Sequence, residues 1–155
     1  MALKRYEDDG PIDMTHYATV AMERGGIVCL SYTGVYGPDM DNSMNTVAYA
    51  ADVSGKVPVG MLLHTTESYD TTKVPYNYQN MDVVSVNSKV AVLKRGVRVT
   101  DYVLPARLSS IVPGTAYVTH SGYLTDQAGD NNVIVGNFES GPSADGYVKV
   151  SINIS

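Results

Sequence analysis

The stretch D-V-V-S-V-N-S-K-V-A-V-L-K-R-G-V-R-V-T-D-Y-V, residues 82–103, decides the fold class of this chain. Val84 and Val86, Val90 and Val92, and Val97 and Val99 are each two positions apart, which is the period of a strand with one face inward and the other outward. Two pairs that favour turns, Asn87-Ser88 and Arg95-Gly96, interrupt the alternation. We therefore predict three short strands joined as a meander.

Strand-like runs of the same kind recur along most of the chain, whereas helical periodicity is almost absent. Short β-rich runs spaced by roughly 8–12 residues and bounded by turn residues are typical of antiparallel barrels and sandwiches. We predict an all-β fold, an antiparallel β-barrel or sandwich. The runs are G-I-V-C-L-S-Y from Gly26, V-P-V-G-M-L-L from Val57, G-T-A-Y-V-T from Gly114, V-I-V-G-N-F from Val133 and Y-V-K-V-S-I-N-I from Tyr147.

The pattern V-x-V-G occurs twice, at Val57–Gly60 and at Val133–Gly136. A glycine inside a strand favours a bulge or a close approach of two backbones, because it has no Cβ. We predict that both stretches are framework positions rather than a binding motif. A chance product of β-rich composition remains the alternative.

The first 15 residues differ in composition from the rest and are expected to form an extended N-terminal arm, followed by one domain at 16–155. Acidic residues surround Gly10-Pro11 in the arm. Such an arm either becomes ordered on a partner or is a frayed terminus. A second polar segment, the Tyr-rich residues 67–80 with Pro75, is expected to be a long surface loop. A chain of 155 residues is long enough for one domain with a real core.

Charge and composition indicate which classes of binding partner are expected for this chain. The net charge of −5 argues against a nucleic-acid binder. No apolar run approaches the roughly 20 residues of a spanning helix, and no apolar region of a secretory signal follows the N-terminus. Tyr is abundant, with 12 Tyr against one Phe and no Trp, which suits half-buried sheet faces and interfaces. The basic residues between positions 89 and 107 form either a solvated face or a contact surface for an acidic partner.

Few residues are candidates for catalysis or metal binding. His16, His64 and His120 lie in separate segments without metal-ligand spacing, and each is interpreted as a structural histidine. Cys29, between Val28 and Leu30, is expected to be a buried thiol in a protein made in a reducing cytosol.

The run G-P-D-M-D-N-S-M-N at 37–45 begins like a calcium loop, but Met44 and Ala50 stand where that loop needs Gly and Glu. An irregular calcium site remains the alternative to a simple turn. The nucleophile-elbow and phosphate-loop patterns are not found either. We expect no enzyme, no cofactor and no metal.

The order of the strand motifs resembles that of a known family. G-G-I-V-C-L, V-P-V-G-M-L and K-V-A-V-L-K-R-G-V-R-V are followed by G-T-A-Y-V-T, V-I-V-G-N-F and a chain end A-D-G-Y-V-K-V-S-I. This resembles the small β-rich head decoration (cement) proteins of tailed bacteriophages, in which a terminal V-G-x-x and D-G-x-V-x-V pair recurs. The resemblance spans most of residues 25–155. It implies a barrel or tulip-like domain, a homotrimer that clamps neighbouring capsid subunits, and no catalytic residues.

On this resemblance we expect a virion structural protein that binds the major capsid protein on the outer surface of the head. It would be assembled in the host cytoplasm, stabilise the assembled shell by binding only that state, and involve neither nucleic acid nor membrane. The expected contact residues are Tyr6, Glu7, Asp8 and Asp9 in the arm, Tyr76 and Tyr78 in the loop, and Lys94, Arg95 and Arg98 in the basic hairpin. Opposite charges across such a contact set its register and association rate.

Two other functions remain open from the sequence. The first is a tail, baseplate or fibre-associated β module that binds host-surface carbohydrate through Tyr rings. The second is a small hydrolase whose site lies between subunits.

Overall fold

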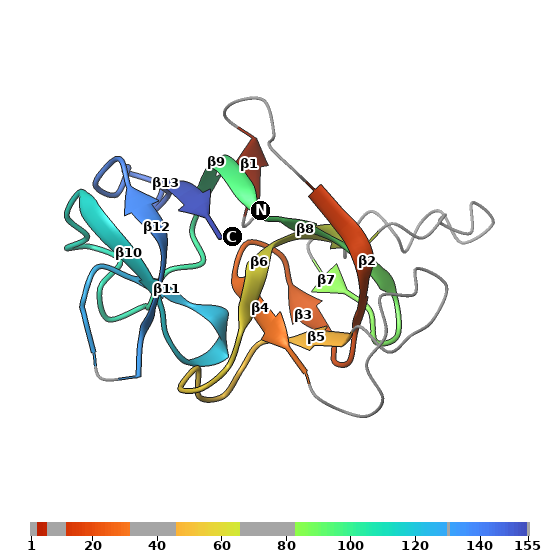
Figure 1. The fold of residues 1–155 in the computed structure, drawn as a ribbon. Helices are drawn as coiled ribbons and strands as arrows, with labels where there is room; N and C mark the ends of the chain where they lie inside the picture. Colours follow the sequence, from red (N-terminus) through yellow and green to blue (C-terminus); the bar gives the residue numbers. More distant parts are fainter. Residues whose placement is uncertain (1–2, 6–11, 32–45, 66–82, 130, 155) are drawn as a thin grey trace.

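The computed structural model describes residues 3–5, 12–31, 46–65, 83–129 and 131–154. These residues form two β lobes side by side, a closed barrel and a six-stranded sheet (Figure 1). The predicted all-β class is confirmed. The barrel runs in the order β2-β5-β4-β6-β8, with bounds β2 (Ile12–Ala18), β4 (Ile27–Leu30), β5 (Thr46–Ala48), β6 (Pro58–Thr65) and β8 (Lys89–Leu93).

The second lobe is a sheet in the order β1-β9-β13-β12-β10-β11. Its pairs are all antiparallel, whereas the barrel includes one parallel pair, β2 with β5. A two-stranded ribbon, β3 (Met22–Glu23) with β7 (Val83–Val84), completes the described strands. The bounds in the sheet are β1 (Leu3–Arg5), β9 (Arg95–Thr100), β10 (Gly114–Val118), β11 (Leu124–Thr125), β12 (Val133–Phe138) and β13 (Val148–Asn153), with a 3-10 turn η3 (His120–Gly122) between β10 and β11.

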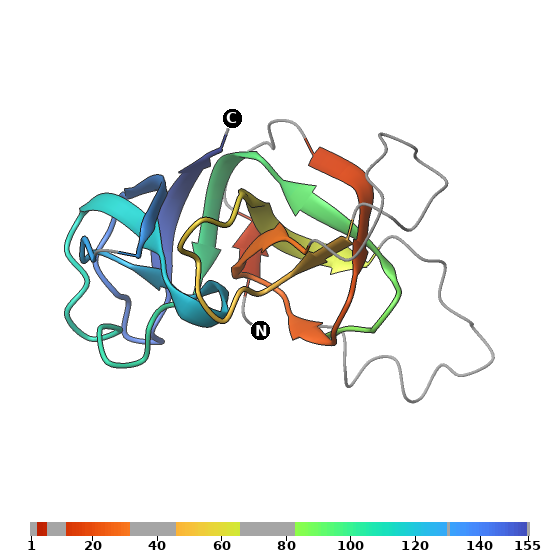
Figure 2. The ribbon, with the colours of Figure 1, turned by 60° about the horizontal axis from the view of Figure 1, so that its bottom comes forward.

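The predicted meander over residues 82–103 is wrong, although its strands exist. β7 pairs with β3, β8 lies between β2 and β6 in the barrel, and β9 lies between β1 and β13 in the sheet. Asn87, with φ of 60°, does form the expected turn. Its N–H, however, donates to the Ala18 carbonyl, which directs the chain toward β2. At Arg95-Gly96 the chain passes from the barrel into the sheet instead of reversing, as both views show (Figures 1 and 2).

Two apolar cores explain this topology. One fills the barrel, and the other lies between the barrel and the sheet and takes side chains from both lobes. β8 contributes to both by simple alternation: Val90 and Val92 belong to the barrel core, Ala91 and Leu93 to the shared core. A strand buried on both faces needs a packed layer against each face, and β8 has the barrel interior on one and the second sheet on the other. The shared core comprises Ile27, Cys29, Val53, Met61, Leu63, Ala91, Leu93, Val103, Ile111, Ala116, Val118, Leu124, Val135, Phe138, Val148, Val150 and Ile152.

The N-terminal segment takes part in both lobes. Leu3–Arg5 pairs with β9 as an edge strand of the sheet, and β2 begins at Ile12. The predicted boundary between arm and domain at residue 15 therefore lies inside β2, and residues 12–15 belong to the barrel. The arm residues Tyr6, Glu7, Asp8 and Asp9 are outside the described part of the chain.

The prediction for the two V-x-V-G glycines is confirmed. A register shift in β4–β6 occurs beside Gly60, and one in β10–β12 beside Gly136. A Cβ built at Gly60 would overlap the carbonyl oxygen of Leu93, and one built at Gly136 would overlap that of Ser151. In both places only glycine lets the neighbouring backbone approach this closely.

Gly136→Ala is expected to destabilise the protein, because its methyl group meets rigid backbone of β13 rather than a flexible side chain. Overpacking of this kind costs about 1–3 kcal/mol of the free energy of unfolding. The matched control is Gly141→Ala, since a Cβ there has ordinary contact with the Ile111 carbonyl at 3.5 Å. Urea denaturation of the three proteins measures the difference, and equal losses in both variants would contradict the close approach.

Candidate functional site

Three polar side chains meet where the barrel joins the sheet. Asp13 and His16 flank a register shift on β2, opposite Val92 and Val90 of the barrel core. Lys94 follows β8 directly. Its ammonium lies 2.8 Å from Asp13 Oδ2, and His16 Nε2 lies 3.3 Å from the same oxygen. A cation and an imidazole therefore share one carboxylate oxygen.

The other oxygen of Asp13 is used within β2. The backbone N–H of Thr15 donates to Asp13 Oδ1 at 2.9 Å, and the Thr15 hydroxyl donates to it at 2.6 Å. Burial disfavours the charged carboxylate, but the hydrogen bonds from Lys94 and Thr15 outweigh it and hold the pKa of Asp13 well below its usual range. Asp13 is thus an ionised anchor between β2 and the bend after β8.

A tyrosine cluster forms a second junction between the lobes. Tyr102, just after β9, stacks on Tyr123 with ring centroids 4.7 Å apart, and it also contacts Tyr49 at a centroid distance of 5.2 Å. The Tyr49 hydroxyl donates to the Glu23 carbonyl and accepts the N–H of Gly26. Burial raises the pKa of Tyr49 and of Tyr102, so both phenols stay neutral. These rings join the barrel to the β10–β11 connection.

Two glycines make room for the Tyr49 ring. A Cβ at Gly26 would lie 2.6 Å from Tyr102 Cδ1 and 2.9 Å from Tyr49 Cζ, and one at Gly122 would overlap Tyr49 Cδ1 and Cε1. Gly122 also has φ of 75°, in the left-handed region. The ring is therefore held between the barrel and η3. His120, which is exposed, contacts the edge of Tyr123 at a centroid distance of 6.1 Å.

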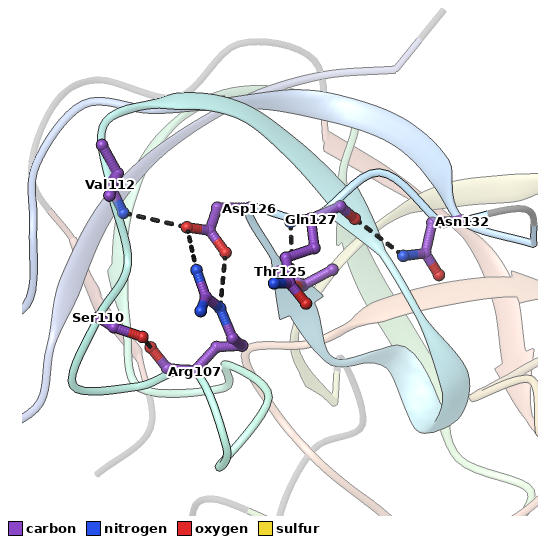
Figure 3. A network of polar contacts seen from close by, with 7 residues as sticks. All are labelled: Arg107, Ser110, Val112, Thr125, Asp126, Gln127 and Asn132. Atoms are coloured by element: carbon purple, nitrogen blue, oxygen red, sulfur yellow. Dashed lines mark hydrogen bonds and ion pairs between the residues drawn. The ribbon is translucent and has the colours of Figure 1, made fainter.

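A third polar network lies at the far end of the sheet (Figure 3). Arg107 forms a bidentate pair with Asp126, Nε to Oδ1 at 3.1 Å and Nη2 to Oδ2 at 3.0 Å. The N–H of Val112 donates to Asp126 Oδ2 at 3.3 Å. The hydrogen bonds from Arg107 lower the pKa of Asp126. This pair ties the loop that precedes β10 to the end of β11.

The basic residues predicted as contacts have three different environments. Lys94 is paired with Asp13 yet remains 40% exposed. Arg95 is exposed, and its Nε donates to Asn153 Oδ1 at 3.1 Å. Arg98 is only 4% exposed, so it is not part of an accessible basic surface. Lys94 and Arg95 therefore lie together on the bend, whereas Arg98 faces inward. Tyr76 and Tyr78 are outside the described residues.

Other sequence predictions have clear outcomes. Cys29 is buried, so the prediction of a buried thiol is confirmed, and burial raises the pKa of the thiol to about 11. His16 is buried and His120 exposed, while the side chain of His64 and the run at 37–45 are not described. Within the described ranges no group of three or more His, Cys, Asp or Glu could hold a metal ion.

The pairs Asp13–Lys94 and Arg107–Asp126 were missed from the sequence, because each joins distant segments. A local pattern, Asp-x-Thr, indicates only the hydrogen bonds between Asp13 and Thr15, because a carboxylate in this motif accepts the N–H two residues on. The tyrosine cluster was also missed, because Tyr49, Tyr102 and Tyr123 come from distant segments.

Comparisons with known proteins add no family. No protein-family model matches the chain, and no curated protein matches its sequence. In the part of the chain that the structure describes, no helix is long and apolar enough to cross a membrane. The described residues form a β framework with a cationic bend between its lobes, at the half-buried Lys94 and the exposed Arg95.

Asp126→Asn is expected to lower the free energy of unfolding at neutral pH and to flatten its decline in acid. A carboxyl whose pKa is lowered in the folded state adds stability above its unfolded pKa, about 3.9. That stability is lost as the pH falls through the folded pKa. Urea denaturation between about pH 2.5 and pH 7 measures the profile. Asp145→Asn, on an exposed turn, is the control and should follow the wild type; an Asp126→Asn profile parallel to the wild type would contradict the pairing.

Proposed function

We propose that this chain is a structural protein of a bacteriophage particle, a head decoration protein that binds assembled major capsid subunits. It acts from the outer surface of the virion as a homotrimer and is assembled in the host cytoplasm. Its binding stabilises the head, because a ligand that binds only the assembled shell shifts the equilibrium toward that state.

One observation supports this proposal above the others. Two motifs carry the family resemblance: V-I-V-G-N-F forms β12, and D-G-Y-V-K-V leads from a turn into the neighbouring strand β13. β12 pairs with β13 in the register Gly136↔Ile152 and Phe138↔Val150, and Gly136 permits the close approach. Both strands contribute side chains to the shared core, so the two motifs belong to one structural unit of this chain.

The proposed contact surface is the bend at Lys94 and Arg95, and the contact residues expected in the arm and in the Tyr-rich loop are proposed beside it. Arg95 and the outer part of Lys94 offer cations to acidic groups on the shell. The arm residues Tyr6, Glu7, Asp8 and Asp9 and the loop residues Tyr76 and Tyr78 stay proposed contacts. Arg98 is omitted from this surface because of its burial. Charges of this kind govern association rate and orientation more than affinity.

The test uses empty heads of the source phage that lack this protein, mixed with the purified full chain. We expect co-sedimentation with assembled heads, saturation at many copies per particle, and no binding to unassembled capsid subunits. Arg95→Glu should slow association and reduce its salt dependence, whereas Lys56→Glu, at an exposed position away from the bend, should not. Failure to bind heads would contradict the proposal, and binding to host cells or glycans instead would favour the tail-module alternative.

A further inference from the structure

Tyr102 and Tyr123 stack because their backbones run side by side in the same direction. Val103 and Leu124, the residues that follow them, form a parallel bridge, and the N–H of Leu124 donates to the Tyr102 carbonyl at 3.2 Å. The ring centroids lie 4.7 Å apart with 14° between the ring planes, which matches the usual spacing of paired strands. Side chains at neighbouring positions of parallel backbones run in the same direction, so equivalent ring atoms face each other.

The hydroxyl groups of these two rings lie at the same end of the stack. Burial raises the pKa of Tyr102, and the neighbouring Tyr123 phenol raises it further, because a phenolate there would lie beside a like charge. Since the hydroxyls lie together, the ring carbons ortho to them lie together as well. In an oxidised tyrosine these ortho carbons share the unpaired electron with the oxygen, and two such rings form a bond there.

Tyr49, the third ring of the cluster, has a different relation to Tyr102. Its plane is tilted by 32°, and its centroid lies 5.2 Å away. Its hydroxyl is held by the barrel backbone, since it donates to the Glu23 carbonyl and accepts the N–H of Gly26. Tyr102 and Tyr123 are therefore the pair whose ring faces oppose each other. Both are half-buried, so part of each ring is accessible to a small oxidant.

We propose that Tyr102 and Tyr123 are a site of oxidative cross-linking, at which a one-electron oxidant converts the stacked pair into a dityrosine. Each phenol loses one electron to the oxidant and one proton to the solvent. The two phenoxyl radicals couple, and a carbon–carbon bond forms between their ortho carbons. The hydrogens on the bonded carbons then move to the two oxygens as protons, which restores both phenol rings. In total, two electrons and two protons leave the protein.

The stacked geometry favours coupling within this pair. The new bond forms perpendicular to the ring planes, where the orbitals of the two radicals overlap, and nearly parallel rings provide that overlap. The Tyr102 ring also has little room to turn away, because a Cβ at Gly26 would lie 2.6 Å from its Cδ1. Reactants held in a productive geometry react faster than the same groups free in solution.

The cross-link would join two segments at the junction of the lobes. A bond between positions 102 and 123 closes a covalent loop that contains β10 and η3. It fixes the chain after β9 to the β10–β11 connection, where a single parallel bridge now holds them. Closing a loop restricts the unfolded chain and so stabilises the folded one. This inference concerns the chain itself and holds whether or not the protein binds phage heads.

The test illuminates the purified full chain, at low concentration, with tris(bipyridine)ruthenium(II) and persulfate. Persulfate accepts the two electrons and becomes two sulfates. We expect the blue fluorescence of dityrosine in the monomer band of a denaturing gel, and a mass lower by two hydrogen atoms. After trypsin digestion, peptide 99–107, whose single tyrosine is Tyr102, should be joined to peptide 108–149 at Tyr123. The oxidised protein should also unfold at a higher urea concentration.

Tyr123→Phe keeps a ring in the stack but has no phenol to oxidise, so this cross-link should be lost. The matched control is Tyr117→Phe, a half-buried tyrosine of the same tryptic peptide, which should cross-link like the wild type. If Tyr123→Phe fails to fold, wild-type protein oxidised in urea provides the comparison, and its yield of the joined peptides should fall. Equal yields from folded and unfolded protein would overturn the proposal, and so would cross-links mainly between chains or through Tyr117.

Discussion

The structure depends on strands that are buried on both faces. In β4, β6 and β8, neighbouring residues alternate between the barrel core and the core shared with the second sheet. Leu62 packs in the barrel opposite Val92, while the adjacent pair, Met61 and Leu93, packs in the shared core. Burying a side chain of this size contributes about 1.5–3 kcal/mol. The barrel strands β4, β6 and β8 contribute side chains to both cores. Without the second sheet, the outer face of these strands would be exposed to water, and the sheet would lose the side chains that cover its own apolar face.

Other features follow from that sharing. β8 must end in the barrel and β9 must begin in the sheet, which places the bend at Lys94–Gly96 between the lobes. Polar groups brought to this junction need partners, and Asp13 provides one for Lys94. Gly60 is required nearby because the carbonyl of Leu93 approaches it closely. The stack of Tyr49, Tyr102 and Tyr123 joins the lobes at a second place, where ring contacts substitute for strand pairing.

Period-two alternation was enough to predict the fold class and the strands at 89–93 and 95–100, since it reflects backbone geometry alone. It could not predict partners. Val90 and Val92 have the same pattern whether the next strand is a hairpin neighbour or lies in another lobe. Alternation also does not say which face is inward. On β9 the buried residues are Arg98 and Thr100, and Thr100 is satisfied there by bonds to the Gly25 carbonyl and the Tyr102 N–H.

The sequence could predict the candidate site only where the residues that form it are neighbours in the chain. Lys94 and Arg95 stand together in the chain and were identified as basic contacts. Asp13, which determines how much of Lys94 is available, comes from a distant strand and is found only in the structure. The glycine predictions succeeded because a missing Cβ has the same steric meaning in any fold.

Native-state hydrogen exchange of Leu93→Ala tests the shared core most directly. Leu93 is fully buried in that core, so its truncation should cost about 2–5 kcal/mol. Amides of the β4–β5 ladder in the barrel and of the β10–β12 ladder in the sheet should lose protection by the same free energy, because the lobes open together. Loss of protection in one ladder alone would show that the lobes unfold independently and would contradict this account.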